Sequence, residues 1–284
     1  MRIALVGNPG SGSADDADPG TMMEELGAEV VHFPIERASE AAGSDAGRIA
    51  VAGGDGSIAP AALAAIEAGV ELAVIPLGTA NDFARRMGIP DEPAAAVRVA
   101  VEGAETRTID LARIGGRPFL NLVSLGLSPM AAAAAEDLKP KLGAFAYTVG
   151  ALRAGIAGDP VGCRIACDGD LLFEGEAWQA MVGCTGAFGG GATVDADADD
   201  GQLDVVVIEA GARAALAKHA VGMRTGTIEG QRGVHTDRSA KVLIEVEGME
   251  EDLNVDGEIV SSGEVGGADL EFAVQQQALR LVNG

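Results

Sequence analysis

Three short turns rich in glycine and polar residues carry the residue types that phosphate chemistry needs. The central turn, Gly53-Gly54-Asp55-Gly56-Ser57, follows an apolar run typical of a buried strand and precedes an alanine-rich stretch with helical character. Glycines at such a turn let the backbone approach a phosphate, and the helix N-terminus adds a favourable field. Asp55 would repel a bare phosphate but would bind a Mg²⁺ ion lying between the two. An ordinary glycine-rich turn with an Asx cap is an equally good interpretation of these residues alone.

The other two turns have the same character. One is Asn8-Pro9-Gly10-Ser11-Gly12, which follows the apolar run of residues 2–6. Gly7, just before this turn, and Gly12 have P-loop spacing, but Ser13 stands where a P-loop has its phosphate-binding lysine, so the motif fails. The last turn, Gly78-Thr79-Ala80-Asn81-Asp82, follows another predicted strand at residues 71–75.

Predicted strands and helices alternate through the first hundred residues, which indicates a parallel sheet with helices on its faces. Ligands of such sheets bind beyond the carboxyl ends of the strands. All three turns fall at those ends, so we expect them to converge on one phosphate-binding crevice.

The pattern changes near residue 106. Short predicted strands then dominate, and turn signals such as Asp168-Gly169 and Asp256-Gly257 separate several of them. The sequence therefore predicts an α/β nucleotide-binding domain at residues 1–105 and a mainly antiparallel β-sandwich domain at residues 106–284. The last predicted strand, residues 278–282, could return to the first domain.

Composition excludes some classes of function. The chain has 20 basic and 43 acidic residues and a net charge of −23, which argues against nucleic acid as a partner. Such acidity suits a protein solvated in concentrated salt, or simply an acidic proteome. No run approaches the roughly 18 apolar residues of a membrane span, and the N-terminus shows no signal peptide, so we expect a cytoplasmic protein without a transmembrane segment.

The turns and several later motifs resemble the catalytic domain of the diacylglycerol kinase family, in its soluble prokaryotic lipid-kinase branch. The most specific stretch is Pro76-Leu77-Gly78-Thr79-Ala80-Asn81-Asp82-Phe83-Ala84. The resemblance implies an active site between an α/β domain and a β-sandwich, and ATP-dependent phosphorylation of a diacylglycerol-like lipid. It also implies peripheral access to a membrane surface, and it leaves a homodimer open. The other matching segments are 8–12, 53–57, 109–111, 121–126, 141–147, 199–205 and 255–258.

The same resemblance assigns roles to residues. Phosphoryl transfer needs held phosphates, neutralised charge and a positioned hydroxyl. Glu258, with Asp256 beside it, would accept the proton of the lipid hydroxyl, although Asp256-Gly257 alone is more simply a hairpin turn. The expected Mg²⁺ ligands, direct or through water, are Asp55, Asp82 and Asp110. The expected ATP-binding residues are Asn8, Pro9, Gly10, Ser11, Gly12, Gly53, Gly54, Asp55, Gly56, Ser57, Gly78, Thr79, Asn81 and Asp82.

An acidic loop, residues 195–202, invites comparison with a calcium loop. It fails that test, because Asp200 and Val206 stand where an EF-hand has glycine and glutamate. The resemblance implies a structural Mg²⁺ site instead, with the Asp200 carboxylate and backbone carbonyls near Asp197 and Gln202. A solvated acidic loop is the alternative.

Two other functions remain open. An NAD kinase-like enzyme shares the Gly-Gly-Asp-Gly turn but has a different second motif. A non-catalytic nucleotide-binding regulator is suggested by Ala59 and Pro60, which stand where the family tends to have Asn and Glu, and by the short segment 33–48. Ser57 replaces the family's usual threonine and keeps the hydroxyl.

Overall fold

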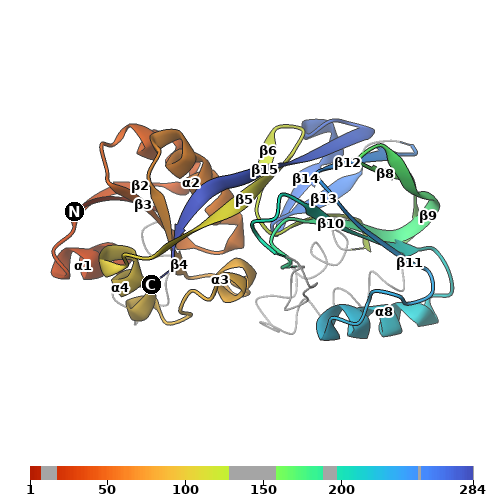
Figure 1. The fold of residues 1–284 in the computed structure, drawn as a ribbon, viewed down its shortest axis with the longest axis horizontal. Coiled ribbons are helices and arrows are strands. Elements are labelled where there is room, and N and C mark those ends of the chain that lie inside the picture. Colours follow the sequence, from red (N-terminus) through yellow and green to blue (C-terminus); the bar gives the residue numbers. More distant parts are fainter. Residues whose placement is uncertain (8–17, 128–157, 188–196, 249–250, 284) are drawn as a thin grey trace. The chain divides into compact units, whose positions relative to one another are not determined.

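The computed structural model describes residues 1–7, 18–127, 158–187, 197–248 and 251–283 (Figure 1). The chain forms two compact units. The first contains residues 1–111 and 276–284, and the second contains residues 112–275. The division falls inside strand β5 (Thr106–Ile114), a few residues beyond the boundary expected from the sequence.

The first unit is built on a parallel sheet. Its strands are β1 (Arg2–Val6), β2 (Glu29–Phe33), β3 (Arg48–Gly53) and β4 (Glu71–Pro76), in the order β2-β1-β3-β4. The carboxyl-terminal part of β15 (Asp269–Val282) continues this sheet beside β4, also in parallel. The alternation of strands and helices in the sequence correctly predicts this arrangement.

Helices cover both faces of the parallel sheet. Helices α1 (Pro19–Glu25) and α4 (Pro93–Glu102) share one apolar cluster with alternate residues of β1, β3 and β4. The other face receives α2 (Asp55–Ala68) and the 3₁₀ segment η1 (Ile35–Gly43), which pack on each other and on the sheet. The short helix α3 (Asp82–Met87) follows β4. This two-sided cover explains why the central strands are apolar on both faces.

Arg48 ties α4 to the sheet. This nearly buried side chain forms an ion pair with Glu71 across β3 and β4, with an Nη2–Oε2 distance of 2.7 Å. It also donates hydrogen bonds to the carbonyl oxygens of Ala100 and Gly103, at 2.8 and 2.9 Å. These carbonyls belong to the end of α4, where a helix leaves its last acceptors without partners in the helix. The buried charge is therefore paired, and the guanidinium also donates to two backbone carbonyls.

The second unit is antiparallel. The strand pairs of this unit whose register is defined within the described residues run antiparallel, and their buried apolar side chains form one large cluster. Helix α8 (Ala214–Thr225) covers a smaller second apolar cluster on β9 and β10. This fold class, an α/β domain followed by a β-sandwich-like domain, is the one that the sequence predicts. The strands are β6 (Arg117–Phe119), β7 (Leu122–Gly126), β8 (Val161–Cys167), β9 (Asp170–Gly183), β10 (Leu203–Glu209), β11 (Val234–Ser239), β12 (Lys241–Val246), β13 (Asp252–Val255) and β14 (Glu258–Ser261), with the adjoining parts of β5 and β15.

Candidate active site

Two of the three predicted turns meet in the first unit. They follow β3 and β4, and the N–H of Leu77 donates to the carbonyl of Gly53 at 2.9 Å. The backbones touch so closely that a Cβ atom on Gly78 would lie 2.6 Å from the Cα of Gly54. Glycine is therefore required at position 78, whereas a Cβ on Gly54 would make a tight contact of 3.3 Å with the Cα of Gly78. The turn at residues 8–12 lies outside the described residues.

The Asp55 carboxylate links the two turns. Its Oδ2 and Oδ1 accept hydrogen bonds from the backbone N–H groups of Asp82 and Phe83, at 3.1 and 2.9 Å. Asp55 therefore caps the start of α3 from 27 residues earlier in the chain. Asn81 supports the same corner: it has φ of 49°, and its Oδ1 accepts a hydrogen bond from the N–H of Gly78 at 2.9 Å.

The beginning of α2 has the features of an anion site. This 14-residue helix has Gly54 as its N-cap, a residue with no side chain that could cap the first N–H groups. The Ser57 hydroxyl donates a hydrogen bond to the Gly54 carbonyl at 2.6 Å, which stabilises the turn. Thr79, in the facing turn, is exposed. Backbone donors, the helix field and nearby hydroxyls together suit a phosphate group.

The carboxylates of this corner fit Mg²⁺ only in part. Asp55 and Asp82 are neighbours, and Asp82 is nearly buried and forms an ion pair with Arg85 at 3.0 Å. Asp110 is fully buried, and its Oδ1 accepts from the N–H of Gln277 at 2.7 Å. Within the described ranges, no three His, Cys, Asp or Glu residues cluster closely enough to hold a metal ion. Two carboxylates still fit Mg²⁺, which commonly uses one or two of them with phosphates and water.

Asp256 has a clear structural role in the second unit. It and Gly257 adopt positive φ values of 47° and 95° in the two-residue turn between β13 and β14, as the hairpin interpretation predicts. The Asp256 carboxylate accepts hydrogen bonds from the N–H groups of Leu120, Asn121 and Leu122, at 2.8, 2.8 and 2.9 Å. It therefore anchors the hairpin to the segment that enters β7.

Glu258 is placed differently. Its side chain is 56% exposed, and its Oε2 lies 2.5 Å from Nη2 of Arg117 on β6. Its Oε1 has no hydrogen-bond partner among the described residues. One oxygen is thus held while the other is accessible, which suits a proton acceptor better than the fully engaged Asp256. The catalytic roles of both residues remain predictions.

We expect Asp256→Asn to lower the free energy of unfolding by about 2–3 kcal/mol. The amide would turn an NH₂ group toward backbone N–H donors and would lose charge-assisted hydrogen bonds, which are worth about 1.5–3 kcal/mol. Chemical denaturation would measure this loss. Asp252→Asn, at an exposed position at the start of β13, is the matched control and should change stability by no more than a few tenths of a kcal/mol.

The acidic loop at residues 197–202 is paired with a basic side chain of this chain, Arg238 on β11. The Arg238 guanidinium lies between the carboxylates of Asp200 and Asp204, with a Nε–Oδ1 distance of 3.0 Å to Asp204. Asp200 also accepts a hydrogen bond from the Gln202 N–H at 2.9 Å. Arg238 thus neutralises carboxylates that a metal would need. Metal binding through Asp197, Asp200 and Gln202 remains a prediction, with Arg238 as the competing partner.

Asp204 is the unusual member of this group. It is nearly buried, its Oδ2 has no hydrogen-bond partner among the residues that the structure describes, and burial raises its pKa from 3.8 to about 6 despite the attraction of Arg238. An acid whose pKa is higher in the folded chain than in the unfolded chain stabilises the fold when it is protonated. That contribution is present below about pH 4 and is lost as the pH rises through 6.

We therefore expect Asp204→Asn to change how stability depends on pH. Relative to this variant, the unmodified chain should lose up to about 3 kcal/mol between pH 4 and pH 7, because each pKa unit corresponds to about 1.4 kcal/mol. Urea unfolding of both proteins across this range would measure the difference. Asp170→Asn, at an exposed position, is the control: the difference in stability between it and the unmodified chain should not change with pH. A flat result for Asp204→Asn as well would contradict the raised pKa.

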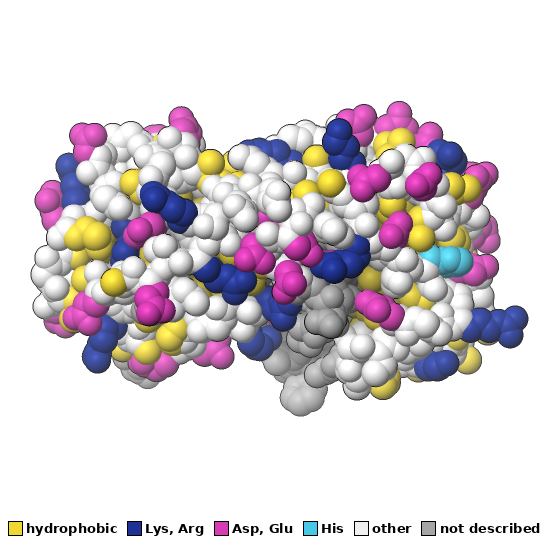
Figure 2. Space-filling view, viewed as in Figure 1, with side chains coloured by type: hydrophobic (Ala, Val, Ile, Leu, Met, Phe, Trp, Pro, Cys, Tyr) yellow, Lys and Arg dark blue, Asp and Glu magenta, His cyan; other side chains and the backbone are white. Residues whose placement is uncertain are grey.

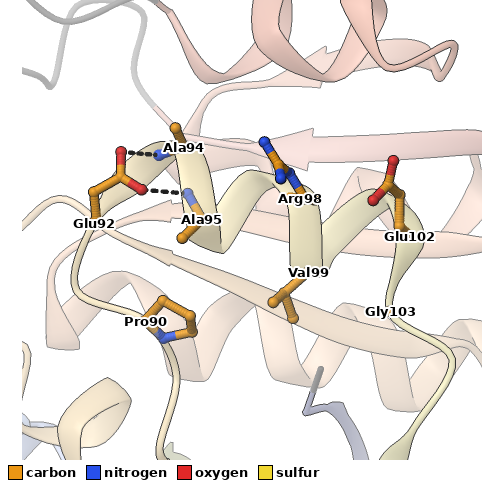
Figure 3. Close-up of a pocket in the computed structure, with 8 residues that line it drawn as sticks. All are labelled: Pro90, Glu92, Ala94, Ala95, Arg98, Val99, Glu102 and Gly103. Atoms are coloured by element: carbon orange, nitrogen blue, oxygen red, sulfur yellow. Dashed lines mark hydrogen bonds between the residues drawn. The ribbon is translucent and has the colours of Figure 1, made fainter.

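A surface groove of about 470 Å³ lies elsewhere in the first unit, along α4 (Figure 3). The Glu92 carboxylate at its start accepts hydrogen bonds from the N–H groups of Ala94 and Ala95, at 3.1 and 2.7 Å. No residue of the glycine-rich turns lines it, so the groove is not the candidate active site. The lining residues are Pro90, Glu92, Ala94, Ala95, Arg98, Val99, Glu102 and Gly103.

Comparison with known proteins defines the class to which this fold and site belong. Residues 3–114 match the model of the diacylglycerol kinase catalytic domain. Residues 121–283 match the model of the YegS C-terminal NAD kinase beta sandwich-like domain. The chain belongs to the diacylglycerol kinase family of phosphotransferases, as the resemblance in its sequence predicts.

Individual relatives agree with this placement. A Pseudomonas aeruginosa protein named "Probable lipid kinase YegS-like" is 36% identical over 237 residues, which cover 81% of this chain and 74% of the relative. The "Diacylglycerol kinase" of Bacillus subtilis is 32% identical over 228 residues, covering 78% and 74%.

Solved structures show the same fold. A diacylglycerol kinase from Bacillus anthracis str. Sterne aligns with a TM-score of 0.77 and 22% identity, covering 100% of this chain and 97% of the other. An NAD kinase from Archaeoglobus fulgidus in complex with ATP aligns with a TM-score of 0.52 and 14% identity, covering 99% and 93%.

In the part of this chain that the structure describes, no helix is long and apolar enough to cross a membrane.

Proposed function

We propose that this protein is an ATP-dependent lipid kinase that transfers the γ-phosphate to a hydroxyl of a diacylglycerol-like lipid. The observation that carries the proposal is the meeting of two glycine-rich turns at the uncapped start of α2, with the Asp55 carboxylate between them. That corner offers backbone donors, a helix field and carboxylates, which phosphoryl transfer requires of a donor site. Membership of the diacylglycerol kinase family supports a lipid acceptor.

Each group has a proposed part in the reaction. The backbone of Gly54 and Gly56 and the Thr79 hydroxyl bind the phosphates of ATP, and the Ser57 hydroxyl turns from the Gly54 carbonyl to donate to them. Asp55 and Asp82 hold Mg²⁺, which when bound neutralises charge on the phosphates. Asp110 would contribute through water, because it is fully buried and already accepts a backbone hydrogen bond.

On the acceptor side, the accessible Oε1 of Glu258 takes the proton of the lipid hydroxyl while Arg117 holds Oε2. Asp256 acts indirectly by fixing the hairpin from which Glu258 projects. The lipid would be drawn from a membrane surface, in the cytoplasm, because a diacyl lipid is nearly insoluble in water.

A substrate panel tests the proposal. Purified protein, Mg²⁺ and labelled ATP would be incubated with diacylglycerol, phosphatidylglycerol, ceramide, a polyprenol and NAD, each separately. Transfer of label to a lipid and not to NAD is the expected result. Labelled NAD would indicate an NAD kinase-like enzyme instead. Binding of ATP without transfer to any acceptor would indicate a non-catalytic nucleotide-binding regulator.

A further inference from the structure

Helix α8 and its flanks carry positive charge in an otherwise strongly acidic chain. Residues 210–228 include Arg213, Lys218 and Arg224 and no Asp or Glu, whereas the whole chain has 43 acidic and 20 basic residues. In Figure 2, drawn from the same side as Figure 1, the part of the surface over α8 shows Lys or Arg and hydrophobic side chains. A basic surface of this kind contrasts with the net charge of −23.

The two faces of α8 differ in what they contact. Leu216 and Met223 pack against the apolar cluster on β9 and β10, and His219 is buried beside them. The opposite face is exposed, and Val221 on it is 62% exposed, the largest exposure of any large hydrophobic side chain in the described ranges. The exposed residues of the helix are Ala214, Ala217, Lys218, Ala220, Val221 and Thr225.

Stabilisation of the helix itself does not explain this face. Basic residues near a helix C-terminus interact favourably with the helix dipole, and acidic residues in the first turn would do the same at the other end. The first turn of α8 contains no acidic residue. A role confined to the dipole would also leave Val221 exposed without a reason. Arg213, at the N-cap position, is accounted for separately, since its guanidinium lies 4.6 Å from the Trp178 ring centroid.

We propose that the outward face of α8 docks on an anionic lipid surface, an inference that rests on the proposed lipid-kinase function. Lys218 would meet the negatively charged headgroups, while Val221 and the small alanine side chains let the helix lie close to the acyl boundary. The apolar face of α8 is packed on the second unit, so the contact with lipid would rest on Lys218 and on the exposed Val221 beside it, on a face without acidic residues. Each basic residue near such a surface strengthens binding about fivefold.

Salt concentration decides whether the charges near α8 or the net charge of the whole chain dominates the interaction with an anionic membrane. At about 0.01 M salt the Debye length is about 30 Å, so the surface senses and repels the full negative charge. At about 0.15 M it is about 8 Å, and only charges close to α8 are sensed, among them the Asp159 carboxylate 3.9 Å from Arg213. At about 1 M it is about 3 Å, and the attraction of Lys218 is screened as well. Binding should therefore be strongest at intermediate salt.

Co-sedimentation of the full chain with vesicles tests this proposal. The vesicles would be phosphatidylcholine with or without about a third phosphatidylserine, at the three salt concentrations and without nucleotide. The unmodified chain should bind only the anionic vesicles, with a maximum at intermediate salt. Lys218→Glu should weaken binding about tenfold or more at that maximum. Val221→Ser should weaken it severalfold even at high salt, since it removes an apolar contact.

Arg98→Glu is the matched control, because Arg98 is also an exposed basic residue on a helix, α4, and its reversal changes the net charge equally. It should leave vesicle binding unchanged. The proposal is overturned if the unmodified chain fails to bind anionic vesicles at intermediate salt, or if Arg98→Glu weakens binding as much as Lys218→Glu. If vesicles bind as expected but no lipid is phosphorylated, the docking surface stands and the kinase function fails. If lipids are phosphorylated while Lys218→Glu binds vesicles normally, the kinase function stands and the docking surface fails.

Discussion

Asp55→Asn is expected to lower the turnover of ATP with a lipid acceptor by roughly a hundredfold or more while the chain remains folded. The substitution keeps the size of the side chain and removes the negative charge that would hold Mg²⁺ against the phosphates. Without that charge the phosphates are held less well and their charge is less neutralised when the γ-phosphate is transferred. Steady-state kinetics with labelled ATP would measure the loss.

The structure adds a second effect that the experiment must separate. Both carboxylate oxygens of Asp55 accept hydrogen bonds from backbone N–H groups at the start of α3. In Asp55→Asn, the side-chain NH₂ group would point at one of these N–H donors, and that hydrogen bond would be lost. We expect this to lower the free energy of unfolding by about 1–2 kcal/mol, the size of a lost helix cap. Thermal unfolding of Asp55→Asn and of an exposed control, Asp91→Asn, would quantify it. Normal turnover in the folded variant would contradict the assignment of Asp55.

Glu258→Gln is expected to reduce kcat by roughly a hundredfold, with little change in the KM for ATP. A glutamine can still bond to Arg117 but cannot accept the proton of the lipid hydroxyl. Because the base acts on the acceptor, nucleotide binding should be spared. Because Glu258 is exposed, we expect the variant to fold normally, and chemical denaturation of the same preparation checks this.

The Arg117 pair sharpens this test. Arg117→Met should lower kcat about tenfold in the unmodified chain and should have no further effect in Glu258→Gln, since it acts only by holding that carboxylate. The Arg164–Glu245 pair, at 2.6 Å between β8 and β12, is a similarly exposed control, and Arg164→Met should leave kcat unchanged. If Asp256→Asn removed turnover from a folded protein while Glu258→Gln did not, the two roles would be exchanged.

The sequence predicts the architecture well because architecture follows local patterns. Apolar runs followed by glycine-rich turns define the parallel strands, and the carboxyl ends of neighbouring parallel strands must share one edge. That rule alone brings Gly54 and Gly78 to the same corner. The Asp256-Gly257 turn is equally local, since few dipeptides other than Asn-Gly and Asp-Gly favour positive φ at both positions.

The partners of the charged side chains could not be predicted in this way. Asp256 accepts hydrogen bonds from backbone more than a hundred residues earlier, and the pairing depends on how β13 lies against β7. Arg238 reaches Asp204 because the two residues are directly opposite in the β10–β11 register. A pattern of residue types carries no register between distant strands, so the sequence could not predict that Arg238 pairs with Asp200 and Asp204; whether a metal also binds at residues 197–202 stays a prediction.

The path of β15 has a consequence for how this protein is made on the ribosome. The first unit needs residues 276–284, but these are translated only after the 112–275 segment has emerged. At about 5–20 residues per second, the edge of β4 stays uncovered for roughly ten seconds or longer. An uncovered parallel edge next to apolar strands can pair with another nascent chain. Translation speed through the second unit and chaperone supply should therefore govern how much of this protein reaches the folded state in a heterologous host.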